Sequence, residues 1–86
     1  MKFKFTEYQD LATGGYKDCD LTLDAGDQEA YFDGGTFFHS SVGERYQMDA
    51  KDDKGNEYII AWILKDEDED PEYLDWKNPT MLLKRA

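Results

Sequence analysis

Residues 57–64, Glu-Tyr-Ile-Ile-Ala-Trp-Ile-Leu, contain the most apolar run of this 86-residue chain. Large apolar side chains fall on both faces of this segment, which is typical of a central strand that is covered on both sides. Residues 45–50 instead alternate between polar and apolar positions, as a strand with one buried face does. The loop between the two segments contains Gly55, which can adopt a positive φ angle in a tight turn. The sequence therefore predicts a β-hairpin at the centre of the fold.

Other strand-like segments lie on both sides of this hairpin. In residues 16–24, the side chains of Cys19, Leu21 and Leu23 alternate with polar ones. One face of this strand is therefore expected to be buried and the other to face solvent. Further strands are expected at residues 2–6, 29–33, 36–39 and 80–84, the last of them at an edge of the sheet.

The expected fold is mostly β, a small antiparallel sheet of about five or six strands arranged as a meander or a barrel. No window shows an apolar pattern of helical period beyond about two turns. Short helices are alternatives at residues 66–78 and at residues 6–11. The length allows one small domain, residues 1–86, and its six Tyr, five Phe and two Trp residues can fill a core.

Acidic residues outnumber basic residues by 20 to 10, which gives a formal net charge of −10. Such a charge excludes ordinary binding to DNA, RNA or an anionic membrane, because these polyanions need a positive surface. It favours a cationic partner, such as the basic groove of a protein, a divalent metal or a polyamine. A competing interpretation is that the acidic surface only keeps the protein in solution.

The cysteine content and the N-terminal sequence point to a reducing compartment. Cys19 is the only cysteine, so the chain cannot form an internal disulfide. The first five residues, Met-Lys-Phe-Lys-Phe, alternate in character and do not form the apolar core of a signal peptide or a membrane span. The expected location is therefore the cytoplasm.

The densest charge lies directly after the most apolar segment. We call residues 66–75 the acidic run, because they contain seven carboxylates and no basic residue. Alternate aspartates at its start have the spacing of the first three ligands of an EF-hand, but Pro71 stands where glycine is required and Lys77 where glutamate is required. An EF-hand is therefore excluded. A looser cation site in the acidic run, or at residues 52–56, is a weaker alternative.

Three other patterns resemble active sites without meeting their chemical requirements. Residues 75–77, Asp-Trp-Lys, have the D-x-K spacing of some nucleases, but such a tripeptide is frequent by chance. Cys19 and His39 are the residue types of a nucleophile and its base, but the expected burial of Cys19 makes its thiol inert. One cysteine and one histidine are too few for a structural zinc site. The sequence thus predicts no enzyme, no cofactor and no metal site.

Asp18, Asp20 and Asp24 fall on the outer face of the strand expected at residues 16–24, and we call them the aspartate strip. Alternate residues of a strand are about 6.6–6.8 Å apart, a spacing similar to that of successive phosphates along a nucleic-acid strand. From residue 18 to residue 44 the chain contains no Lys or Arg. Nucleic-acid-binding proteins line their grooves with Lys and Arg, so the aspartate strip is expected to fit such a groove.

The aspartate strip and the acidic run together supply the residues that we expect to bind a partner. Each carboxylate is expected to pair with a lysine or an arginine of that partner. Aromatic side chains are expected to anchor the contact, and the candidates are Tyr31, Tyr73 and Trp76. The predicted partner-binding residues are Asp66, Glu67, Asp68, Glu69, Asp70, Glu72, Asp75, Asp18, Asp20 and Asp24.

In size, acidity and aromatic content, and in its two acidic segments at residues 18–33 and 66–75, the chain resembles the small inhibitors encoded by phages and plasmids, the anti-CRISPR and antirestriction proteins. Several members of that group act as nucleic-acid mimics. The resemblance implies a monomeric inhibitor of a bacterial defence nuclease, acting in the bacterial cytoplasm. Its target would be a basic nucleic-acid-binding protein, such as a Cas effector or a restriction enzyme. The alternatives are a generic acidic protein-interaction module and a weak divalent-cation-binding domain.

Overall fold

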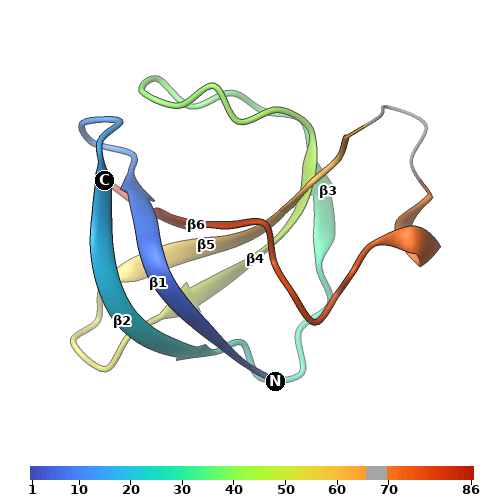
Figure 1. Cartoon of the computed structure of the whole chain (residues 1–86), viewed down its shortest axis with the longest axis horizontal. Helices are drawn as coiled ribbons and strands as arrows, with labels where there is room; N and C mark the ends of the chain where they lie inside the picture. The colour runs from blue at the N-terminus through green and yellow to red at the C-terminus, as the bar shows by residue number, and fades with distance from the viewer. Residues whose placement is uncertain (66–69) are drawn as a thin grey trace.

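The computed structural model describes residues 1–65 and 70–86, which form one curled sheet of six strands (Figure 1). In this part of the chain a short 3-10 helix, η1 (Pro71–Tyr73), is the only helical element, and no helix is long and apolar enough to cross a membrane. The strands are β1 (Lys2–Asp10), β2 (Tyr16–Asp24), β3 (Tyr31–Asp33), β4 (Arg45–Lys51), β5 (Glu57–Ile63) and β6 (Met81–Lys84). Their order across the sheet is β2-β1-β6-β5-β4-β3. The expectation of a mostly β fold is confirmed.

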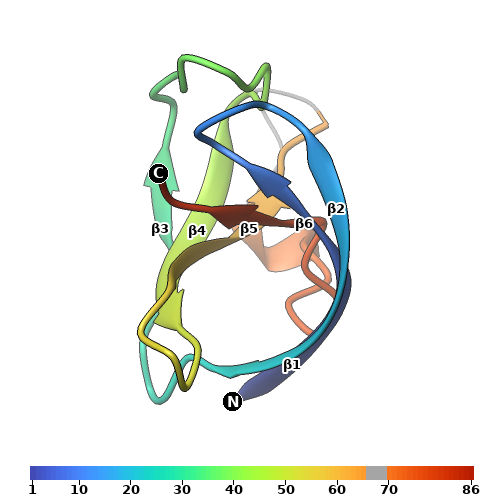
Figure 2. The same cartoon turned by 90° about the vertical axis from the view of Figure 1, so that its left-hand side faces the viewer.

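Neighbouring strands are antiparallel except for β1 and β6, which run parallel and pair only near the end of β1. The sheet does not close into a barrel, so β2 and β3 are its two edges. Figures 1 and 2 show that the sheet curls, so that β1 and β2 cross over β4, β5 and β6. The fold therefore has two layers, although all strands belong to one sheet.

The predicted central hairpin is confirmed. β4 and β5 pair without interruption from Arg45 opposite Ile63 to Lys51 opposite Glu57. Gly55 in the connecting loop has a φ angle of 85°, as its place in the turn predicts. This hairpin forms most of the layer that β1 and β2 cross.

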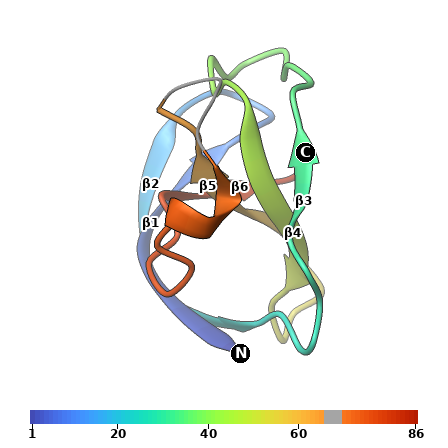
Figure 3. The same cartoon turned by 90° about the vertical axis from the view of Figure 1, so that its right-hand side faces the viewer.

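The main core lies between the two layers of the curled sheet. Residues 70–79 cover one end of it, where Figure 3 shows η1 in front of β5 and β6. Trp76 from this segment packs its ring 5.2 Å from that of Trp62 on β5. The buried side chains of the main core are Phe3, Phe5, Leu23, Ala25, Met48, Ala50, Tyr58, Ile60, Trp62 and Leu82.

A smaller core lies on the other face of β5. Ile59, Leu83 and Leu11 are buried there, and Phe37 from the loop at residues 34–44 packs against them. β5 is therefore covered on both faces, which confirms the prediction from its apolar sequence. The loop at residues 34–44 acts as the cover of this second core.

The expectation that the last strand lies at an edge is wrong, because β6 lies between β1 and β5. Leu82 and Leu83 point to opposite faces of the sheet and are 1% and 0% exposed. Complete burial of two successive residues requires cover on both faces and neighbours on both sides. Position inside the sheet gives β6 both.

Local structure differs from expectation at three further places. Residues 6–11 are not helical, because β1 continues to residue 10 and β2 pairs with it along its length. Residues 36–39 form a turn with an isolated bridge in place of a strand, and the strand expected from residue 29 begins at Tyr31. Of the helix considered at residues 66–78, only η1 is present among the described residues.

Two glycines with positive φ allow a test of the contact between the β1–β2 turn and the loop at residues 34–44. A Cβ atom at Gly14 (φ 78°) would lie 2.5 Å from the carbonyl oxygen of His39, whereas one at Gly26 (φ 64°) would have nothing within 4 Å. Both alanine variants bear the left-handed backbone cost of about 1–2 kcal/mol. We expect Gly14→Ala to lower the free energy of unfolding by about 1–3 kcal/mol more than Gly26→Ala in urea titrations. Equal losses would contradict the contact.

Candidate protein-binding surface

The aspartate strip lies on β2, the longer of the two edge strands. Asp18, Asp20 and Asp24 are all exposed, while Leu23 between them is buried against the main core. This arrangement follows from the alternation of the sequence, because successive side chains of a strand point to opposite faces. The predicted outward orientation of the strip is confirmed.

A lysine of β1 and the N-terminal amine lie beside the strip, and no local pattern in the sequence indicates either contact. Lys4 places its Nζ atom 4.0 Å from Asp20, and the N-terminal amine lies 3.6 Å from Asp24. All of these groups are more than half exposed, so solvent screens the two pairs and they add little to stability. The strip is therefore partly neutralised at two of its three positions. Asp18 instead faces Glu7 across the ladder, a like-charge pair.

The first part of the acidic run, from Asp66 to Glu69, lies outside the described residues. Asp70, Glu72 and Asp75 are exposed. Asp70 caps η1 by accepting a hydrogen bond of 3.0 Å from the backbone N–H of Glu72. Asp75 accepts hydrogen bonds from the turn that follows it. These carboxylates hold local turns together and still face solvent.

The two acidic surfaces are separate in the described structure. Figure 1 shows η1 and β2 at opposite ends of the longest axis of the molecule. Asp70 and Glu72 flank one end, while the aspartate strip follows the outer face of the sheet at the other. A single partner surface would therefore have to span much of the molecule to contact both.

The exposed aromatic side chains are partly those that the sequence suggested. Tyr73, the last residue of η1, is 81% exposed, which suits it to anchor a contact. Trp76 is half-buried, because its ring packs 5.6 Å from Tyr46 and closes the core. Tyr31 is 45% exposed at the β3 edge. Phe38 is 95% exposed and was not singled out in the sequence, which contains no pattern that distinguishes it from the adjacent Phe37.

A buried arginine organises the largest polar cluster of the described residues. The Arg45 side chain is 1% exposed, and one of its terminal nitrogens donates to the carbonyl oxygens of Gly35 and Gly43 at 2.8 and 3.1 Å. Its Nε–H donates to Gln47 at 2.7 Å. The ring of Phe37 lies against the guanidinium at 4.6 Å. Arg45 thus fastens both ends of the loop at residues 34–44 over the second core.

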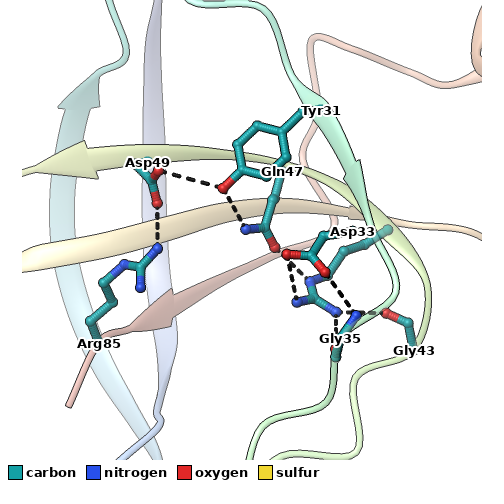
Figure 4. Close-up of polar contacts among 8 residues, drawn as sticks. Tyr31, Asp33, Gly35, Gly43, Gln47, Asp49 and Arg85 are labelled. Carbon is teal, nitrogen blue, oxygen red and sulfur yellow. Dashed lines mark hydrogen bonds and ion pairs between the residues drawn. The ribbon is translucent and has the colours of Figure 1, made fainter.

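The cluster continues through polar side chains to Arg85, which follows β6 (Figure 4). Gln47 donates from its amide to the hydroxyl of Tyr31 at 2.8 Å, and this hydroxyl donates to Asp49 at 3.5 Å. Asp49 also pairs with Arg85 at 2.7 Å. Within residues 1–65 and 70–86, no buried side-chain polar atom lacks a partner. The cluster therefore has a structural role and offers no orphaned group to a substrate.

The residues considered for catalysis and cation binding are engaged elsewhere. Burial raises the pKa of the Cys19 thiol, which favours its protonated form. The thiol donates a weak hydrogen bond to the carbonyl oxygen of Phe5 at 3.5 Å. His39 is exposed, and its ring makes an edge-to-face contact with that of Phe38. The carboxylate of Asp52 accepts hydrogen bonds from the backbone of residues 54 and 56 and from the side chains of Asn56 and Tyr58. It is the cap of the hairpin loop, and no group of metal-ligating side chains is present among the described residues.

A hollow of about 500 Å³ lies between the β4–β5 hairpin and the end of β2. Carboxylates line it, but each already has a cation beside it. Asp49 pairs with Arg85 at 2.7 Å, and Glu57 pairs with Lys51 at 3.8 Å. Asp24 has the N-terminal amine. The hollow therefore offers little uncompensated charge to a ligand.

No known protein family, curated protein or solved structure matches this chain. Every carboxylate among residues 1–65 and 70–75 is exposed or half-buried, whereas the side chain of Arg45 is buried. The result is an acidic exterior whose most regular feature is the aspartate strip.

The Arg45 cluster can be tested with two arginine variants. Arg45→Met leaves two carbonyl groups and the Gln47 amide without their donor, so we expect a loss of about 2–4 kcal/mol in the free energy of unfolding. Arg85→Met breaks an exposed ion pair and should cost less than about 1 kcal/mol. Urea denaturation measures both. Similar losses for the two variants would show that Arg45 does not fasten the loop.

Tyr58 predicts a loss of stability in alkaline solution. Burial raises the pKa of Tyr58 from 10 to about 12, and the neighbouring Asp52 carboxylate adds to the rise. Above pH 10 the unfolded chain releases this proton and the folded chain retains it, so the stabilisation is complete below pH 10 and is lost as the pH rises through 12. Thermal unfolding should show a shallower decline over this range for Tyr58→Phe than for the wild type. Parallel declines would refute the assignment.

Proposed function

We propose that this chain is a non-enzymatic acidic protein that occupies a basic nucleic-acid-binding surface of another protein and excludes nucleic acid from it. The observation that carries the proposal is the aspartate strip, three exposed carboxylates on one face of a nine-residue strand. Alternate positions of a strand repeat at about 6.6–6.8 Å, so Asp18 and Asp20 are one repeat apart, and Asp20 and Asp24 are two repeats apart. Lysine and arginine side chains arranged for a phosphate backbone can pair with charges at such a spacing.

The pairing of β2 with β1 supports this proposal. β2 pairs with β1 from Tyr16 to Asp24, with a single register shift. Aspartate has a short side chain, so its carboxylate stays close to the backbone position. A preorganised row of charges loses less conformational entropy on binding than a flexible one. Asp70 and Glu72, at the other end of the molecule, supply a second region of the same sign.

We further propose that the target is a bacterial defence nuclease, such as a Cas effector or a restriction enzyme, encountered in the bacterial cytoplasm. The support is the resemblance in size, acidity and aromatic content to anti-CRISPR and antirestriction proteins. A nuclease of this kind has an open basic cleft that receives nucleic acid. A monomer of this size could enter such a cleft, since its principal dimensions are 36, 29 and 17 Å.

One observation favours a second candidate function, a generic acidic interaction module without mimicry. Lys4 and the N-terminal amine partly neutralise Asp20 and Asp24, which lowers the charge that the strip presents. In such a module the carboxylates would matter as a class and not by position. The two candidates therefore differ in whether the place of the neutralised charge matters.

Two charge-matched variants separate these candidates. The strip variant carries Asp18→Asn, Asp20→Asn and Asp24→Asn. The control variant carries Asp27→Asn, Glu29→Gln and Asp53→Asn, which are exposed positions off the strip. Each protein is used to capture partners from lysates of bacteria that carry defence systems, and the captured nuclease is then tested for binding to its nucleic acid.

We expect the wild type and the control variant to displace nucleic acid from the captured protein, and the strip variant to do so about tenfold less well. Binding should also weaken as salt rises, because charge pairs are screened beyond about 8–10 Å at physiological ionic strength. Equal displacement by the two variants would favour the generic module. A partner that binds without releasing nucleic acid would refute mimicry.

A further inference from the structure

We infer that an extended segment of the partner binds to the free edge of β2 and adds a further strand to the sheet. Basic and apolar residues alternate in this segment. This inference names the part of the partner that docks, and it rests on the proposed function only in requiring the partner to be basic. Such docking uses the backbone N–H and C=O groups of β2 as well as its carboxylates. Its dependence on the backbone distinguishes it from binding by charge alone.

The free edge of β2 presents unpaired backbone groups. In the β1–β2 ladder, Ala25 donates its N–H to the carbonyl of Met1 at 3.0 Å. Hydrogen-bonding positions alternate along an antiparallel pair, so the N–H and C=O groups of Thr22 and Asp24 point away from β1. β2 is the last strand in the sheet on this side. An unpaired strand edge of this length is a template for another chain.

The inner face of β2 is incompletely covered along the same edge. Leu23 is buried, but Cys19 and Leu21 are only half-buried although they face the main core. A strand added beside β2 would place its inward side chains next to these two residues. Apolar residues at those positions would complete the cover that the curled sheet leaves open.

The other neighbour of β2 shows which sequence suits it. β1 places Lys2 opposite Asp24 and Phe3 opposite Leu23, and the alternation continues with Lys4 and Phe5. Its lysines lie on the outer face beside the aspartate strip, and its phenylalanines lie in the core. A segment with the same alternation would satisfy both faces of β2 from the free side. Charge complementarity with Asp18, Asp20 and Asp24 thus selects a basic segment.

A second copy of this chain does not fit the same edge. Pairing of β2 with another β2 would bring aspartates from both copies onto one face, and like charges on adjacent strands destabilise a sheet. Charged edge strands are a common protection against such self-association. The opposite edge, β3, has only three residues and offers a much shorter template.

The test compares two capped peptides of identical composition. The alternating peptide is Lys-Phe-Lys-Phe-Lys-Val, and the block peptide is Lys-Lys-Lys-Phe-Phe-Val. Fluorescence polarisation measures binding to the full chain, and NMR amide shifts locate the site. We expect the alternating peptide to bind about tenfold more tightly than the block peptide, with shifts at residues 18–24. Equal binding of the two peptides, or shifts elsewhere, would overturn the inference.

Thr22 provides matched variants of the protein. Thr22→Pro removes an N–H that the β1–β2 ladder does not use and obstructs the free edge, whereas Thr22→Val keeps that N–H. We expect Thr22→Pro to weaken binding of the alternating peptide by about tenfold and Thr22→Val to leave it unchanged. If Thr22→Pro fails to fold, the alternating peptide with N-methyl groups on alternate backbone nitrogens replaces it. Strand addition would be excluded if the Thr22→Pro protein bound the alternating peptide with full affinity, or if the N-methylated peptide bound the wild type with full affinity.

The same variants separate this inference from the proposed function. Displacement of nucleic acid that survives Thr22→Pro but is lost in the strip variant would support mimicry and overturn strand addition. Peptide binding that depends on Thr22, with no displacement of nucleic acid by the wild type, would support the docking mode and overturn mimicry. A dimer detected by analytical ultracentrifugation and abolished by Thr22→Pro would overturn the choice of occupant.

Discussion

The structure depends on covering both faces of β5 in a chain of 86 residues. Ile59 and Ile60 point to opposite faces of the sheet and are 1% and 0% exposed. A domain of this size buries only about 60% of the surface that its unfolded chain exposes, so there is little material for two layers of cover. The chain meets the need on one face by curling its own sheet. It meets the need on the other face with a loop.

Each solution has a consequence for the surface. Curling brings β1 and β2 over the main core but leaves β2 as an edge without a neighbour on its outer side. The loop at residues 34–44 has little secondary structure of its own, so it is held by the buried guanidinium of Arg45. The carbonyls of Gly35 and Gly43 accept hydrogen bonds from this guanidinium, so its buried donors are satisfied while it holds the loop. The free edge of β2 and the buried Arg45 thus both follow from covering two faces of β5 with a short chain.

The distribution of charge follows the same division. Carboxylates stay on the outside, where a net charge of −10 keeps molecules apart but opposes compaction. Aspartates on the outer face of β2 also protect a long edge from pairing with copies of itself. That protection acts against acidic strands and not against basic ones. An edge that repels its own kind in this way retains the capacity to accept a partner of opposite charge.

The sequence alone determined the features that depend on neighbouring residues. The period of two in residues 16–24 and 45–50 predicted strands and their buried faces, and with them the outward orientation of the aspartate strip. The apolar run of β5 predicted cover on both faces. The location of Gly55 predicted the hairpin turn. These are local properties, because the direction of a side chain on a strand follows from its position in the alternation.

Only the tertiary structure decided which segments meet. The place of β6 inside the sheet, the lysine of β1 beside Asp20 and the reach of Arg45 to Gly35 and Gly43 all join parts of the chain that no local pattern relates. The same holds for the free edge of β2, which exists because the sheet curls without closing. Pairing between distant strands depends on the packing of the whole core. The acidic face of β2 could therefore be predicted from the sequence, whereas its open backbone edge could not.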